Sequence, residues 1–129
     1  MDIEQKLNLF MDDYYNGTVP HPISNFLRLW DSSVALEIKI WGNAIRLSSI
    51  KSLKKNNGNG TAALKWIISL AETHQVCISG EIFPLKEKNA LNKEHLRKWS
   101  IKNGFTIVGD NIFYNYGLLE RKNNIKLII

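Results

Sequence analysis

A glycine-rich polar segment between a strand pattern and a helix pattern constrains the fold of this chain most strongly. Residues 54–60 read Lys-Lys-Asn-Asn-Gly-Asn-Gly. They follow a strand pattern over 44–53 and precede an apolar stripe with helical spacing over 61–74. A β-branched run over 75–82 predicts the next strand. A strand, a helix and a strand in this order predict a right-handed crossover that joins two neighbouring parallel strands.

The segments on either side of this unit predict antiparallel pairs and further helices. Residues 18–22 form an extended connector with two prolines, whereas 23–30 fit a short helix or a strand. The remaining expected elements are a helix over 3–15, a first hairpin strand over 35–40, a helix over 92–103, and closing strands over 106–108 and 112–116. The predicted fold class is α/β, with a mixed, largely antiparallel sheet, a central parallel βαβ unit and flanking helices.

Length and composition exclude several classes of protein. The 129 residues suit a single domain over 1–129, in which 1–22 would form an N-terminal helix and connector. No apolar run approaches the roughly 20 residues of a membrane span, and no signal-peptide pattern opens the chain. The single cysteine, Cys77, excludes an internal disulfide, and no metal-ligand cluster occurs. We therefore expect a cytoplasmic protein with no membrane or metal partner.

The net charge of +5 is unevenly distributed along the chain. Residues 1–50 carry an acidic excess, and the basic excess begins at Lys51, next to the glycine-rich segment. This pattern suits an anionic ligand, although ordinary surface charge explains it at least as well. Nucleic acid is a minor alternative, because the basic C-terminal third carries aromatic residues but no known nucleic-acid-binding motif.

The glycine-rich segment has the features of an anion-binding loop. Gly58 and Gly60 allow close approach of the backbone to a ligand, because neither has a Cβ atom. The unpaired N–H groups at the start of the following helix carry the positive end of its dipole, and phosphate is their usual ligand. The segment lacks the Gly-Lys-Ser/Thr ending of a P-loop and the third glycine of a dinucleotide fingerprint. A plain flexible turn is the alternative interpretation of the loop taken alone.

The stretch 45–105 resembles the GNAT acyltransferase superfamily, whose members transfer an acyl group from coenzyme A to an amine. The matching pattern is a strand, the loop Lys-x-x-Gly-x-Gly over 55–60, a helix, a parallel strand, and a helix that ends before Gly-Phe at 104–105. The similarity is strongest to small GNAT-like proteins that bacteriophages encode. The resemblance implies an acyl-CoA-binding core over 44–105, with acetyl-CoA as the cofactor. It also implies acyl transfer to an amine of a protein or a small molecule.

The resemblance further implies which residues would bind coenzyme A. The N–H groups of the loop would hold the pyrophosphate, and the pantetheine arm would lie where the two parallel strands splay apart. A backbone N–H near Ile50 would polarise the thioester carbonyl. The implied cofactor-binding residues are Ser49, Ile50, Lys51, Lys55, Asn57, Gly58, Asn59, Gly60, Thr61, Asn92, Trp99 and Lys102.

Two positions depart from the family pattern. The loop begins with Lys55 where the family often has Gln or Arg, which keeps the charge but loses the planar fork of arginine. The position that usually holds a tyrosine general acid is Ser100, whose hydroxyl is a poor acid. The candidate general base is Glu81, which lies nearest the expected cleft, with Glu37 as a further candidate.

These departures leave the function and the partners partly open. The main hypothesis is an acyl-CoA-dependent N-acyltransferase with Glu81 and Ser100 as its candidate catalytic residues. The alternative is a catalytically weak or inactive CoA-binding or protein-interaction module, such as a phage protein that acts on a host factor. The sequence does not identify the amine acceptor. A homodimer could form through an exposed sheet edge near 111–116 or through the apolar end 125–129.

Overall fold

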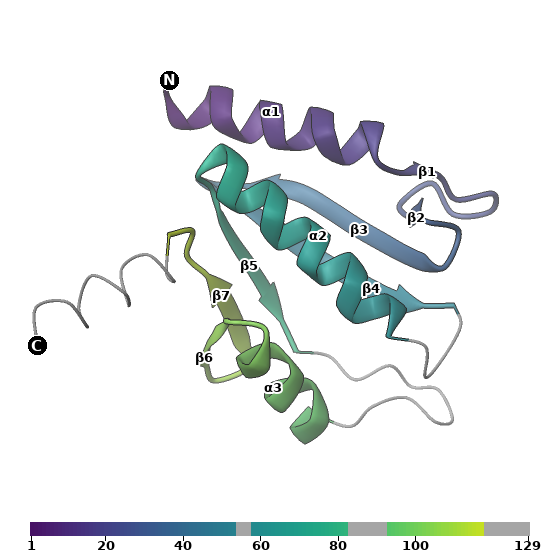
Figure 1. The fold of residues 1–129 in the computed structure, drawn as a ribbon, viewed down its shortest axis with the longest axis vertical. Coiled ribbons are helices and arrows are strands. Elements are labelled where there is room, and N and C mark those ends of the chain that lie inside the picture. The colour runs from purple at the N-terminus through teal and green to yellow at the C-terminus, as the bar shows by residue number, and fades with distance from the viewer. Residues whose placement is uncertain (54–57, 83–92, 118–129) are drawn as a thin grey trace, which may run out of the picture.

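The computed structural model describes residues 1–53, 58–82 and 93–117 (Figure 1). These residues form one seven-stranded sheet in the order β1-β2-β3-β4-β5-β7-β6. Of the described strand pairs, β4–β5 is parallel and the others are antiparallel, which confirms the predicted fold class. The elements are α1 (Ile3–Asn16), β1 (Val19–Pro20), β2 (Arg28–Trp30), β3 (Val34–Trp41), β4 (Ala44–Ser52), α2 (Asn59–His74), β5 (Cys77–Glu81), α3 (Lys93–Lys102), β6 (Thr106–Val108) and β7 (Asn111–Tyr114).

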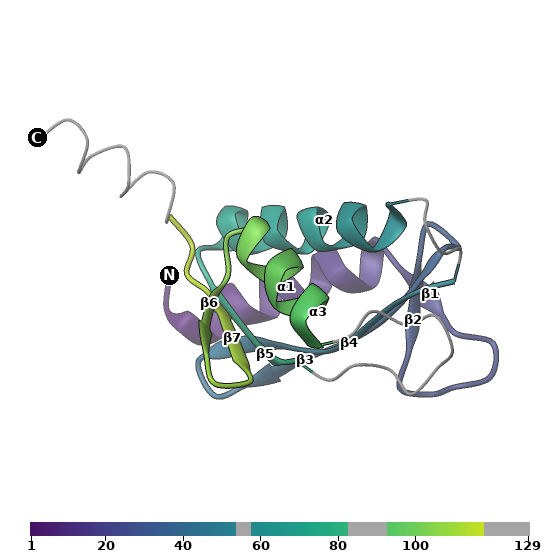
Figure 2. The ribbon, with the colours of Figure 1, turned by 90° about the horizontal axis from the view of Figure 1, so that it is seen from below.

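The hydrophobic core lies between one face of the sheet and the two longest helices. Figure 2 shows α1 and α2 on the same side of the sheet, and the two helices contact each other. The apolar stripe of each helix and alternate residues of the central strands point into this space. The largest fully buried aliphatic and aromatic side chains include Phe10, Tyr14, Leu36, Ile45, Leu64, Ile67 and Ile78. Helix α1 is therefore an integral part of the core.

The connector and the ambiguous segment near the N-terminus form a short hairpin at one edge of the sheet. β1 pairs with β2, and β2 pairs with β3, both antiparallel. Three residues, 31–33, join β2 to β3, and the N–H of Ser33 donates to the carbonyl oxygen of Trp30 at 3.1 Å. Asp31 and Ser32 have φ values of 51° and 55°, the left-handed values of a type I′ turn. Strands of two and three residues are too short to show alternation, which is why periodicity did not separate helix from strand here.

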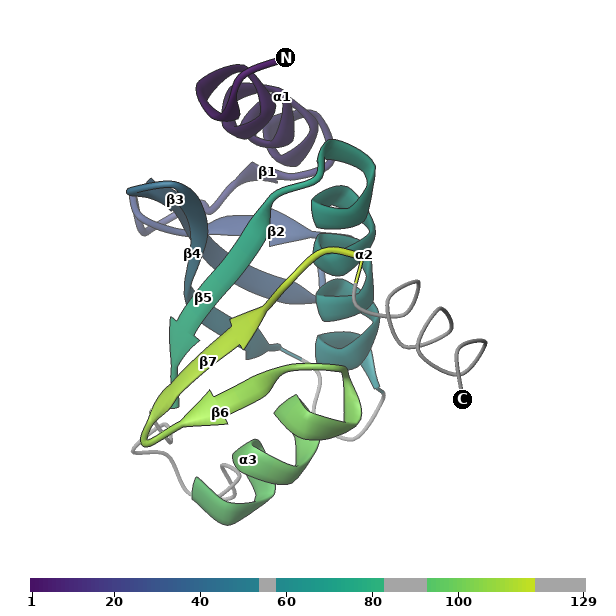
Figure 3. The same cartoon turned by 90° about the vertical axis from the view of Figure 1, so that its left-hand side faces the viewer.

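The last two strands correct the prediction about a dimer edge. β7 lies between β5 and β6, so Asn111, Ile112 and Phe113 are paired on both sides. The expectation that 111–116 forms an exposed sheet edge is therefore wrong. Among the described strands the edges are β1 and β6, as Figure 3 shows for β6. The apolar end 125–129 lies outside the described residues.

Tyr14, the last buried residue of α1, is expected to make the fold sensitive to alkaline pH. Burial raises the pKa of Tyr14 to about 12. Because this lies above the usual value near 10, the buried phenol stabilises the folded state below about pH 10, and this contribution is lost as the pH rises from about 10 to 12. Urea unfolding at increasing pH should show a smaller loss of stability for Tyr14→Phe than for the wild type, by up to about 1.4 kcal/mol per pH unit.

Tyr15→Phe is the matched control for this measurement. The side chain of Tyr15 is 52% exposed, and its charge is a smaller cause of the raised pKa of Tyr14 than burial, so removing its hydroxyl should leave most of the wild-type pH dependence. Equal pH dependence in Tyr14→Phe, Tyr15→Phe and the wild type would contradict the assignment of the alkaline loss to Tyr14.

Candidate functional site

The two parallel strands separate at the point where the sequence predicts a ligand. β4 and β5 are paired as far as Leu47 and Gly80. Beyond them β4 continues to Ser52, and its one partner among the described strands is β3. The register shifts at Glu37 of β3, which leaves Ser48 as an extra residue in β4. A bulge of this kind bends a strand, and it lies where β4 leaves β5.

Three predicted ligand residues follow this bulge in β4. Ser49, Ile50 and Lys51 are all half-buried. The side chain of Ile50 packs against the hydrophobic core, which fixes the backbone of the strand at this position. On the side of β4 that faced β5, Ser49 and Ile50 have no strand partner among the described residues. Their backbone groups are therefore placed to bind an extended ligand in the manner of an added strand.

The start of α2 lies beside the separated strands and presents uncapped N–H groups. Gly58 precedes the helix in the left-handed conformation, at φ 69°, which favours glycine. No side chain caps this end of the helix, so the N–H groups of Asn59, Gly60 and Thr61 have no capping partner among the described residues. A Cβ atom at Gly60 would lie 4.0 Å from the Cβ of Ser52, an ordinary contact. Packing therefore does not require glycine at position 60.

Helix α3 is held against the start of α2 by a side-chain hydrogen bond. The Nε1–H of Trp99 donates to the hydroxyl oxygen of Thr61 at 2.7 Å, and both residues are half-buried. At its own start α3 is fixed to the β6–β7 turn, where Lys93 and Arg97 lie 2.7 and 3.2 Å from a carboxylate oxygen of Asp110. The structure thus brings together two predicted ligand residues that are 38 positions apart.

Two other predicted residues of α3 have different surroundings. Lys102 is exposed in the last turn of the helix. The side chain of Ser100 is 3% exposed, and its hydroxyl donates to the carbonyl oxygen of Leu96 at 2.8 Å. This hydroxyl is therefore engaged with the backbone of its own helix. The role of Ser100 as a general acid stays a prediction.

Glu81 ends β5 on the face of the sheet away from α1 and α2, as the alternation of buried residues along β5 indicates. Its carboxylate pairs with the guanidinium of Arg46 in β4 at 3.2 Å. The guanidinium also lies over the ring of Trp41, 5.8 Å from its centroid. Arg46 was not among the predicted site residues, although its alternation with buried Ile45 and Leu47 places it on the polar face of β4. Its ion pair with Glu81 bridges the two strands where they separate.

Three predicted ligand residues, Lys55, Asn57 and Asn92, lie outside the described residues. Within the described part of the chain no cluster of three or more His, Cys, Asp or Glu side chains is arranged to hold a metal ion. The helices that the structure describes are also too short or too polar to cross a membrane.

A comparison with solved structures finds a protein with a similar fold. The crystal structure of the anti-CRISPR protein AcrVA5 matches with a TM-score of 0.57 and 14% sequence identity, over 67% of this chain and 95% of that chain. At this identity the likeness concerns the fold alone. Comparisons with protein-family models and with curated proteins find no match. The seven-stranded mixed sheet and its helices are consistent with a GNAT-like fold.

Proposed function

We propose that this protein binds acyl-CoA, with acetyl-CoA as the first candidate, and transfers the acyl group to an amine. The observation that carries the proposal is the separation of β4 and β5 after Leu47 and Gly80, beside the uncapped start of α2. The amide-rich pantetheine arm would pair with the backbone of Ser49 and Ile50, where β4 has left β5. The diphosphate would accept hydrogen bonds from the N–H groups at the start of α2.

The chain's own residues would bind and orient the reactants. Thr61 accepts a hydrogen bond from Trp99, so its own hydroxyl proton would point to a phosphate oxygen. A backbone N–H near Ile50 would stabilise the oxyanion that forms when the amine attacks the thioester carbonyl. Glu81, oriented by Arg46, would accept the amine proton. The new C–N bond would replace the C–S bond, and the departing thiolate would take a proton from water.

A CoA-binding module without turnover is the second candidate function. The surroundings of Ser100 favour it, because a buried hydroxyl that donates to Leu96 is not placed to protonate a departing thiolate. Such a module could still act through a partner protein, for example as a phage protein that binds a host factor. The two candidates share the acyl-CoA site and differ only in catalysis.

Calorimetric titration with acetyl-CoA tests the shared site. We expect saturable binding, and we expect Gly60→Val to weaken it at least tenfold, or about 1.4 kcal/mol. The branched side chain would cover the N–H groups at the start of α2, while the space around Gly60 allows the fold to form. Ser69→Val is the matched control, because Ser69 is exposed on the same helix, and it should bind like the wild type.

The outcomes separate the two candidate functions. No binding of acetyl-CoA at millimolar concentration would overturn both of them. Equal affinity of Gly60→Val and the wild type would contradict the placement of the diphosphate at the start of α2. If acetyl-CoA binds, incubation with a panel of protein and small-molecule amines followed by mass spectrometry distinguishes the enzyme, which yields acylated amine, from the module, which does not.

A further inference from the structure

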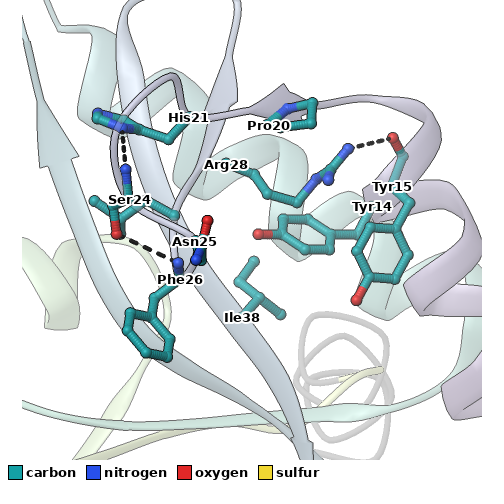
Figure 4. A pocket seen from close by; sticks show the side chains of 10 residues that line it. Tyr14, Tyr15, Pro20, His21, Ser24, Asn25, Phe26, Arg28 and Ile38 are labelled. Atoms are coloured by element: carbon teal, nitrogen blue, oxygen red, sulfur yellow. Dashed lines mark hydrogen bonds between the residues drawn. The ribbon is translucent and has the colours of Figure 1, made fainter.

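The loop over residues 21–27 joins β1 to β2 and lies beside the end of α1, apart from the proposed acyl-CoA site (Figure 4). The N–H of His21 donates to the carbonyl oxygen of Leu27 at 3.1 Å, which closes the base of the loop. Within the loop, Nδ1 of His21 accepts hydrogen bonds from the backbone N–H groups of Ile23 and Ser24, at 3.1 and 3.0 Å. A single ring atom therefore holds two consecutive backbone groups of the loop.

This arrangement requires that Nδ1 of His21 carry no proton. A neutral imidazole has one nitrogen that donates and one that accepts, so the ring proton of His21 lies on Nε2. A second proton can be added only at Nδ1, and it would turn the acceptor of both hydrogen bonds into a donor. The observed loop and the imidazolium form of His21 therefore exclude each other.

The side chains around the ring supply no carboxylate that could pair with an imidazolium. Besides residues of the loop itself and Pro20, the cavity next to His21 is lined by Tyr14, Tyr15, Arg28 and Ile38. Tyrosine side chains are neutral in the pH range in which histidine titrates, so the charge among these neighbours is the guanidinium of Arg28. The charged neighbours of Ile38 in β3, Glu37 and Lys39, do not line the cavity. Among the described residues, an imidazolium here would thus face a cation and no anion.

We propose that His21 makes the β1–β2 loop a pH-sensitive switch, which is ordered while the ring is neutral and released when the ring takes up a proton. Histidine is the side chain that ordinarily changes charge between about pH 5 and 8, so mild acidification would release the loop. The ordered loop presents Ile23 and Phe26 in fixed positions, with 88% and 77% of their surface exposed. Release would leave these two apolar side chains without a defined arrangement.

NMR of the full-length ¹⁵N-labelled protein tests the switch. At about pH 7.5 we expect Nδ1 of His21 to be unprotonated and the backbone order parameters of Ile23 and Ser24 to be about 0.85, as in rigid backbone. At about pH 5 we expect a doubly protonated ring and order parameters below about 0.6. Raising the pH again should restore the first state.

His21→Asn is the matched control for the proton. The side-chain oxygen of asparagine occupies the position of Nδ1 along the side chain and accepts hydrogen bonds from the following N–H groups, but it does not titrate. This variant should keep the loop ordered at both pH values. His21→Leu has no acceptor, and it should leave the loop mobile at both.

His74→Gln excludes a second histidine as the source of the response. Nε2 of His74 lies 2.6 Å from a carboxylate oxygen of Asp13 in α1, the helix whose end lies beside the loop. Because this pair is separate from the bonds of His21, the loop of His74→Gln should respond to acid like that of the wild type.

Several results would overturn the proposal. A proton on Nδ1 of His21 at about pH 7.5 would contradict the required tautomer. A loop that stays ordered around a doubly protonated ring, or a ring that is still neutral at about pH 5, would show that acid does not release the loop. A wild-type response in His21→Asn, or its loss in His74→Gln, would assign the acid sensitivity to another group.

Discussion

Replacing Phe10 by alanine is expected to lower the free energy of unfolding by about 3–5 kcal/mol. The side chain of Phe10 is fully buried on α1, within the cluster that joins α1, α2 and the sheet. The substitution removes a whole ring and leaves a cavity that the surrounding strands cannot fill. Domains of this size are stable by about 5–15 kcal/mol, so the loss would be a large part of the total. Urea unfolding followed by circular dichroism measures it.

Leu9→Ala is the matched control on the same helix. Leu9 is 38% exposed, and its truncation should cost about 1 kcal/mol or less. If Phe10→Ala cost no more than Leu9→Ala, α1 would be an appendage whose contacts contribute little to stability.

Replacing Gly80 by valine is expected to disrupt both the sheet and the proposed acyl-CoA site. A Cβ atom at this position would lie 3.0 Å from the carbonyl oxygen of Leu47 and 3.3 Å from Cγ1 of Ile112. Leu47 belongs to a strand that is paired on both sides here, so its backbone cannot move without breaking hydrogen bonds. We expect a loss of about 2–3 kcal/mol in stability. We also expect binding of acetyl-CoA to be lost, because Leu47 and Gly80 are the last pair before the strands separate.

Cys77→Val introduces the same side chain three residues earlier in β5. Cys77 is half-buried on the opposite face of the strand, where a β-branched residue fits a pleated surface. Urea unfolding and calorimetry with acetyl-CoA should therefore give wild-type values for Cys77→Val. If Gly80→Val behaved in the same way, the close approach of β4 and β5 would not determine the geometry of the site.

The long, strongly periodic elements were predictable from the sequence. In these elements the hydrophobic pattern repeats often enough to distinguish helix from strand. They are α1, the hairpin of β3 and β4, and the β4–α2–β5 unit. The start of α2 is two residues earlier than the expected Thr61, because Gly58 adopts the left-handed conformation that ends the preceding loop. The short strands β1 and β2 were not predictable, since two or three residues show no period.

The contacts of the candidate sites depend on strand register, which the sequence does not contain. The hydrophobic pattern of β4 does not reveal the bulge at Ser48. An extra residue changes only which side chains of β4 lie opposite which residues of β3. The ion pair of Arg46 and Glu81 follows from the register of a parallel pair.

The two edges of the sheet limit how copies of this chain could associate. An exposed edge strand is a template on which another chain can add its own strand. Here β1 has two residues, one of them Pro20, which has no N–H to donate, and β6 has three. Neither edge offers enough backbone groups for a stable continuation of the sheet. Growth of the sheet from one copy into the next is therefore disfavoured at both described ends.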